Sequence, residues 1–381
     1  MTSIADPRVW PPAEAAALYA RTLHQHAEKS LTAATSLEAE RHDAAIFDAF
    51  RALIVKDEGA ALAGIFESAP SAVIYRHLWR ELVRAEAASD DAALATTLFA
   101  FPLTIVTGRE RDDDVAPTLP CVLADISEIA ALLLEHGALG GNQTFALANT
   151  LVAAGAIDIH NLPSLYALRS DAGAIAPRNL APAPIVVDDH DARVHSRFIV
   201  GMAFAARGVD LLADSGVGTW GMPLARLIGR ALAQPSATIL ILPHAPKRLC
   251  VALQHGRAAQ REVSAQLFAS NAIRRMRASV GEPAAVISAH QAFDAPAGGE
   301  LRLSLSSVFD PAQAEGFRCP LYHADQTDDV VNMLLALLQD CRVSDVRVLP
   351  GVHPDRDFTT GQRLLFKASE LGDLPSNITV Q

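Results

Sequence analysis

The sequence predicts a mixed α/β protein, in which a helical N-terminal region is followed by an α/β region with a mixed, partly parallel sheet. Two observations support this prediction. Apolar residues recur at helical spacing through the first part of the chain. Later, short apolar runs alternate with helical segments, which is typical of strand–helix–strand units. The chain has 381 residues, and because one hydrophobic core rarely holds more than about 250–300 residues, we expect more than one domain.

Changes in composition divide the chain into four predicted parts. A helical region covers residues 1–96, and a small α/β segment at 97–170 is expected to pack with it. Residues 171–184 are the predicted linker, and 185–381 form the predicted α/β domain with a mixed sheet. The linker is marked by prolines among small residues, which punctuate regular structure: Pro177, Pro182 and Pro184.

The first half of the chain is expected to be mostly helical. We predict helices at 14–29, 36–55 and 72–88, and strands at 98–106 and 121–123. A further helix should follow Asp125, because Asp125 and Glu128 have the spacing of a capping box, and Gly137 should end it. The small residues of 142–154 favour one more, closely packed helix.

Behind the linker, strands and helices are expected to alternate. We predict strands at 185–187, 209–212 and 238–242, separated by helices at 192–206 and 223–233. This alternation indicates parallel βαβ units.

The alternation then ends, and two hairpins are expected. The run 249–253 is close enough to 238–242 to be its partner, and 285–287 should pair with 301–305. The remaining predicted elements are a long helix at 258–278, a strand at 320–322, a helix at 328–338 and a strand at 346–349.

The composition of the chain is unusually apolar, and this has two interpretations. Half of the residues are apolar and only 6% are aromatic, and the mean hydropathy is +0.19. One interpretation is that apolar surface is buried against a protein partner or by self-association. The other is that the chain simply has a large apolar core.

Charge and cysteine content restrict the class of partner and the compartment. The net charge is −11, whereas nucleic-acid-binding proteins carry a basic excess or stripe, so no nucleic acid partner is expected. No apolar stretch is long and uncharged enough for a membrane span, and no apolar leader is expected at the N-terminus. Four scattered cysteines fit a reducing compartment. We therefore expect a cytoplasmic protein.

Several apolar runs end at or just before a histidine, and ligands of α/β folds bind outside the carboxyl ends of strands. The densest polar cluster holds Asp188, Asp189, His190 and Asp191, followed by His195. Asp191 and His195 would share one helix face. Carboxylates with imidazoles can bind a divalent metal, so Asp188, His190, Asp191 and His195 are candidate ligands. Alternatively, these acids only stabilise the positive end of the following helix.

A glycine-rich segment offers a second candidate site. Gly216, Gly218 and Gly221 lie between a predicted strand and the predicted helix at 223–233. Backbone N–H groups in such a segment can bind a phosphate at the helix N-terminus. Asp214 and the bulky Trp220 argue against this, and a plain glycine-rich turn is the alternative.

No complete catalytic motif is present, so our leading interpretation is a non-enzymatic cytoplasmic component of an oligomeric or multi-protein assembly. One alternative is a metal-assisted hydrolase in which His190, His244 and His323 converge at the strand ends. A second alternative is a nucleotide- or phosphate-binding protein that uses Gly216–Gly221. Because 238–242 and 249–253 look like hairpin partners, His244 and His255 should lie at opposite sheet edges.

Overall fold

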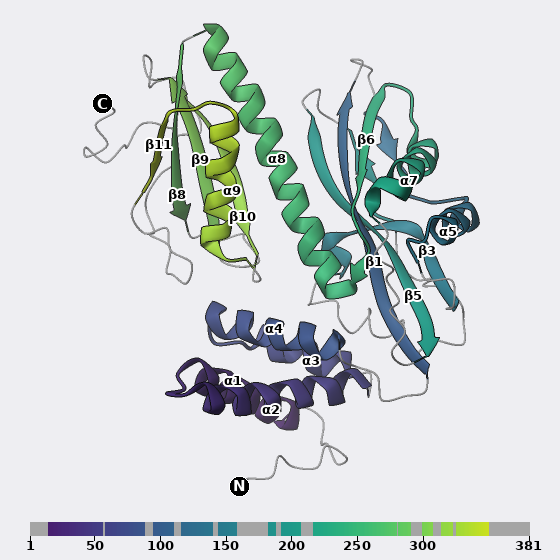
Figure 1. Ribbon diagram of the computed structural model, residues 1–381, viewed down its shortest axis with the longest axis vertical. Helices are drawn as coiled ribbons and strands as arrows, with labels where there is room; N and C mark the ends of the chain where they lie inside the picture. The colour runs from purple at the N-terminus through teal and green to yellow at the C-terminus, as the bar shows by residue number, and fades with distance from the viewer. Residues whose placement is uncertain are drawn as a thin grey trace. The chain divides into compact units, whose positions relative to one another are not determined.

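The computed structural model divides the chain into two compact units, residues 1–257 and 258–381 (Figure 1). The structure describes residues 14–55, 58–87, 94–109, 116–139, 144–157, 182–187, 192–206, 216–279, 281–290, 299–307, 314–322 and 325–349. Within these residues, helices dominate the N-terminal part and mixed sheets follow, so the predicted mixed α/β class is confirmed. None of the helices described has the length and apolar character needed to span a lipid bilayer.

Four helices open the first unit: α1 (Glu14–Leu31), α2 (Ser36–Val55), α3 (Gly59–Glu67) and α4 (Ala72–Ala87). Three of them match the sequence prediction closely, and α3 was not predicted. The helices share a core in which the rings of Phe50 and Phe66 stack at 5.8 Å, and Trp79 meets Phe66 edge-on at 6.0 Å. Aromatic pairs at this spacing add stability beyond their buried area.

The centre of the first unit is an antiparallel sheet in the order β3-β5-β1-β6. Its long strands are β1 (Leu94–Arg109), β3 (Thr144–Ala153), β5 (Arg193–Ala206) and β6 (Ala237–Pro243). The short β7 (Lys247–Arg248) pairs with β1 beyond the end of β6. A separate two-stranded pair joins β2 (Thr118–Leu119) to β4 (Ile185–Val186), and the 3-10 turn η1 (Ala154–Ile157) follows β3.

Helices cover both faces of this sheet. Side chains at even positions of β1 and β5, among them Leu98, Phe198 and Val200, join the core of α1–α4 and the start of α8 (Leu249–Ser279). The opposite face packs against α5 (Ile126–Glu135) and α7 (Val217–Leu232). Successive strand residues point to opposite faces. Because helices cover both faces, alternate positions contribute apolar side chains to one core or the other.

The second unit contains a four-stranded sheet in the order β10-β9-β8-β11. Its strands are β8 (Pro283–His290), β9 (Gly299–Ser307), β10 (Ala314–Leu321) and β11 (Asp345–Val348). The predicted hairpin of β8 with β9 is confirmed, and β8 and β11 are the parallel pair of the described residues. The helix α9 (Thr327–Asp340) and the later part of α8 pack on one face.

Two predicted helices are wrong, because 142–154 and 192–206 contain the strands β3 and β5. Helices cover both faces of these strands, so most positions of β3 and all of 198–206 in β5 are free of polar side chains. In β3, for example, Ala148 and Val152 face one core while Leu147 and Leu151 face the other. Such a continuous run has no period of two and resembles a buried helix.

The predicted arrangement of the segments around α7 and α8 is also corrected. The strands of the first sheet are antiparallel where parallel βαβ units were expected. Residues 249–253, predicted as a hairpin strand, form the first turns of the long helix α8, which the prediction began at 258. The helix α7 begins at Val217, so that Pro223 lies inside it.

The predicted linker at 171–184 lies almost entirely outside the described residues. The structure places the division between its compact units inside α8, after Arg257. The strand β5, which follows the linker in sequence, pairs with β1 and β3, which precede it.

Candidate interaction surface

His244 follows β6 and makes its contacts inside the first unit. Its Nε2 atom lies 2.9 Å from Thr104 Oγ1, and its backbone N–H donates to Pro102 O. Its ring centroid is 5.4 Å from that of His255. Burial, followed by repulsion from His255, lowers the pKa of His244 below its ordinary value of 6.5. The expectation that His244 and His255 lie at opposite edges is therefore wrong, because His255 belongs to a helix and not to a hairpin strand.

His195 does not join His244. It lies in β5, where its Nε2 atom is 3.1 Å from Thr107 Oγ1. Thr104 and Thr107 are three residues apart on β1 and so point to opposite faces of the sheet. The two histidines are therefore held on opposite faces, and neither can contribute to a site built around the other.

The remaining candidate metal ligands and catalytic histidines lie outside the described residues: Asp188, His190, Asp191 and His323. Within the described part of the chain, no three or more His, Cys, Asp or Glu side chains are placed to hold one metal ion. The predicted metal site thus stays a prediction.

The glycine-rich segment coincides with the start of α7. Gly216 is the N-cap residue, and Gly218 and Gly221 belong to the first two turns of the helix. The backbone N–H and the hydroxyl of Thr219 both donate to Gly216 O. Trp220 is fully buried and meets Phe101 edge-on at 5.6 Å between ring centroids. Phosphate binding at these glycines stays a prediction.

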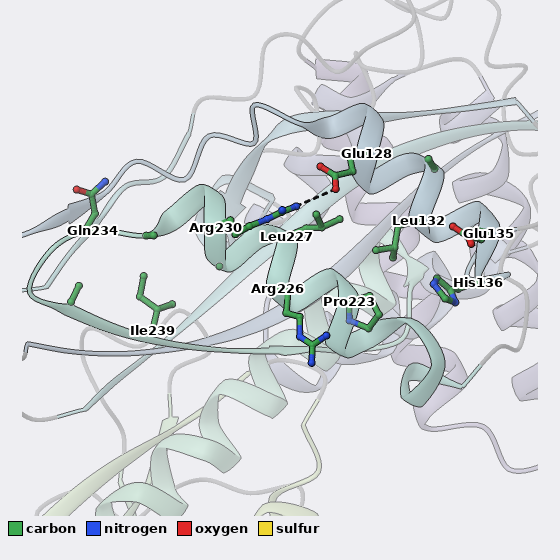
Figure 2. A pocket seen from close by; sticks show the side chains of 14 residues that line it. Glu128, Leu132, Glu135, His136, Pro223, Arg226, Leu227, Arg230, Gln234 and Ile239 are labelled. Carbon is green, nitrogen blue, oxygen red and sulfur yellow. Dashed lines mark hydrogen bonds and ion pairs between the residues drawn. The ribbon is translucent and has the colours of Figure 1, made fainter.

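A groove of about 960 Å³ is lined by residues of α5, α7 and the start of β6 (Figure 2). Leu132 and Leu227 supply apolar lining from the two helices. Arg230 of α7 donates to Glu128 of α5 across 3.1 Å, as the dashed line in Figure 2 marks. Glu135 and Arg226 add one further charge of each sign. The charges in the groove are balanced, so it favours neither an anionic nor a cationic ligand.

The two ends of the first sheet differ in how they are protected. The outer edge of β3 is covered by the segment around Cys121, since Leu123 N donates to Asn149 O and Leu151 N to Cys121 O. At the other end, β6 pairs with β1 alone among the residues that the structure describes. An uncovered sheet edge is a template for pairing with another chain.

The hydrogen bond of His244 fixes which groups of β6 point outward. Because His244 N–H points toward β1, and because the direction alternates along an antiparallel strand, Leu242 and Leu240 also bond to β1. Ile239 and Ile241 consequently direct their N–H and C=O groups away from the sheet. These outward groups are the ones that an added strand would use.

Apart from the exposed Thr238, the side chains of β6 are apolar on both faces. Ile239 and Ile241 pack with the core beneath α7. Leu240, on the other face, is 55% exposed. No residue of Ala237–Pro243 is charged, and its one proline is the last residue. Natural edge strands are usually protected by charges, an internal proline or a bulge, and β6 has none of these.

Sequence reasoning identified this strand but not its exposed edge. An uncharged apolar run of this length is what a central strand also shows, so pattern alone places β6 inside a sheet. The signal that distinguishes an edge is strand order, which depends on long-range pairing of β1 with β5 and β6.

Comparison with models of protein families, with curated proteins and with solved structures finds no match for this chain.

Proposed function

We propose that this chain is a non-enzymatic component of a protein assembly, and that it binds its protein partner by accepting a polypeptide strand at the outer edge of β6. The observation that carries the proposal is the apolar, uncharged edge of β6, whose outward backbone groups at Ile239 and Ile241 have no described partner strand. In strand addition, backbone hydrogen bonds supply affinity and side-chain contacts supply specificity.

The exposed Leu240 supports the same proposal. A leucine that is 55% exposed gains roughly 1 kcal/mol when a neighbouring strand covers it. On the α7 side, an added strand would extend the apolar surface formed by Ile239 and the groove beside it. The surface thus offers apolar contacts on both faces of the added strand.

The histidines support a structural role for the polar groups of this unit. His195 and His244 each bond to a threonine of β1, on opposite faces of the sheet. The alternative of a metal-assisted hydrolase stays a prediction that depends on Asp188, His190 and Asp191, which lie outside the described residues.

The proposal is tested on the tagged chain, purified gently from the cells that encode it. We expect the wild-type chain to migrate in a particle heavier than the 40.5 kDa of one chain, and Leu240→Lys to shift it toward the monomer, because a lysine protects a strand edge. Leu37→Lys is the matched control, since Leu37 is also exposed, at 67%, but lies on α2. A wild-type chain that migrates as a monomer from its own cells would contradict the proposal.

A further inference from the structure

We infer that the strand accepted at β6 comes from a second copy of this chain, paired antiparallel about a two-fold axis that passes through Leu240. This inference rests on the proposed function and names its partner. Antiparallel pairing of a strand with its own copy is the geometry that a two-fold axis produces, and it continues an already antiparallel sheet.

The register follows from the outward backbone groups. With the axis at Leu240, Ile239 of one copy stands opposite Ile241 of the other, and both residues direct their N–H and C=O groups outward. Each of these two equivalent pairs then exchanges two hydrogen bonds, as hydrogen-bonded pairs of antiparallel strands do. No outward group of Ile239 or Ile241 is left without a partner.

The side chains match in the same register. Rotation about an axis perpendicular to the sheet keeps each residue on its own face, so Leu240 meets Leu240 of the second copy and Ile239 meets Ile241. Leu240 is the exposed large apolar side chain of the strand, and pairing buries it against its own equivalent. Aliphatic cross-strand pairs of this kind stabilise sheets.

Charge favours a second copy over a foreign strand. The segment Ala237–Pro243 has no charge to attract an oppositely charged partner, and electrostatic complementarity is the usual source of specificity between different proteins. A matching strand must be uncharged and apolar on both faces. A second copy of the chain supplies such a strand, and its concentration is the concentration of the chain itself.

The contact is expected to be reversible. A seven-residue strand covers less than the roughly 800 Å² per partner of a standard stable interface. Purified chain should therefore show a concentration-dependent equilibrium between monomer and dimer in the micromolar range, with a limiting mass twice the 40.5 kDa of one chain.

A cysteine placed at Leu240 tests the register directly. Leu240 and its copy form the non-hydrogen-bonded pair at the axis, with Cα atoms about 4.5 Å apart, and a disulfide accepts this separation. Under mild oxidation, Leu240→Cys should give a covalent dimer that reductant dissolves. The cysteine is introduced into a Cys341→Ser variant, because Cys341 is the least buried of the native cysteines and could otherwise form a disulfide of its own.

Leu242→Cys is the matched control on the same strand and face. Its copy would lie four residues out of register, about 13 Å along the strand, so no disulfide should form. Cross-linking of Leu242→Cys without Leu240→Cys would overturn the inference.

Sedimentation of the purified chain gives the second test. Ile239→Pro removes an outward N–H while leaving the bonds to β1, a position where edge strands tolerate proline, and Leu240→Lys adds an edge charge. Both variants should stay monomeric where the wild type dimerises, with native far-ultraviolet circular dichroism. Leu37→Lys should dimerise like the wild type.

The two proposals fail differently. If the purified chain is monomeric at every micromolar concentration while the chain from its own cells runs in a larger particle that Leu240→Lys disrupts, the second copy is excluded and a different protein supplies the strand. If both preparations are monomeric, strand addition at β6 itself is excluded.

Discussion

The Nε2 atom of His244 lies 2.9 Å from the Oγ1 atom of Thr104, although the two residues are 140 positions apart in sequence. The pairing of β1 with β6 brings them together, and His255 from the first turns of α8 lies beside the imidazole. The imidazole is therefore held in a half-buried place with a second histidine as its neighbour. Burial first, and repulsion from His255 second, lowers the pKa of His244.

This lowered pKa predicts a loss of stability in mild acid. Between the ordinary histidine value of 6.5 and the lower pKa of folded His244, the unfolded chain binds more protons than the folded chain. The free energy of unfolding must then decrease as the pH falls through this window. His26 and His77, whose pKa values are also lowered mainly by burial, act in the same direction.

His244→Gln isolates the contribution of this residue. Urea unfolding is compared at about pH 7.5 and about pH 5.5, on either side of the ordinary histidine value. The variant should lose less stability between the two pH values than the wild type does. His136→Gln, at an exposed histidine that follows α5, should leave the wild-type difference intact. Equal pH dependence in wild type and His244→Gln would contradict the prediction.

Two helical glycines should respond to alanine with opposite signs. A β-carbon at Gly256 of α8 would lie 2.6 Å from the ring of Phe198, which is fully buried in the sheet beneath it. Alanine favours a helix over glycine by about 1 kcal/mol, but overpacking a core costs typically 1–3 kcal/mol. We expect Gly256→Ala to lower the melting temperature.

Gly64→Ala is the matched comparison within the same unit. Gly64 lies inside α3, and no atom lies within 4 Å of where its β-carbon would be. Only the helix propensity term applies, so the variant should gain roughly 0.5–1 kcal/mol. Thermal unfolding of both variants checks the pair, and a stabilised Gly256→Ala would show that α8 does not pack closely on Phe198.

The sequence predicts local structure well where one face of an element is exposed. The amphipathic helices α2 and α4 appear where spacing placed them. The helix after Asp125 also begins as predicted and ends near Gly137, whose positive φ of 65° suits glycine. The Asp125 side chain, however, makes no cap hydrogen bond. The spacing of Asp125 and Glu128 thus predicted the start of the helix correctly, although the capping box itself does not form.

Prediction of secondary structure fails where both faces of an element are buried. Prediction of an exposed sheet edge fails because that edge depends on strand order. The run that forms β3 and the later part of β5 have few polar positions because helices cover both sides of the sheet. The edge of β6 follows from the long-range pairings of β1, which no local pattern contains. His195 and His244 are separated because they bond to threonines on opposite faces of β1, which could not be foreseen from a prediction that placed His195 on a helix.

The buried ion pair of the second unit gives a prediction with an internal control. Arg261 of α8 is only 7% exposed, and it donates to both carboxylate oxygens of Asp325, at 2.5 Å and 3.2 Å. The same carboxylate accepts the backbone N–H of Tyr322 at 2.6 Å. Breaking a buried pair by removing one partner leaves an uncompensated charge, which costs about 3–5 kcal/mol.

Arg261→Met and Asp325→Leu should therefore each be strongly destabilising, and the double variant should lose clearly less than the two single losses together, since no charge is then left unpaired. Arg275→Met is the comparison: Arg275 also joins α8 to β10, through Glu315, but it is exposed, and such pairs contribute less than about 1 kcal/mol. Hydrogen exchange of β10 and α9 peptides measures the loss within this unit. Additive losses in the double variant would mean that Arg261 and Asp325 contribute independently, and the pair would not be the contact that holds α8 to the loop before α9.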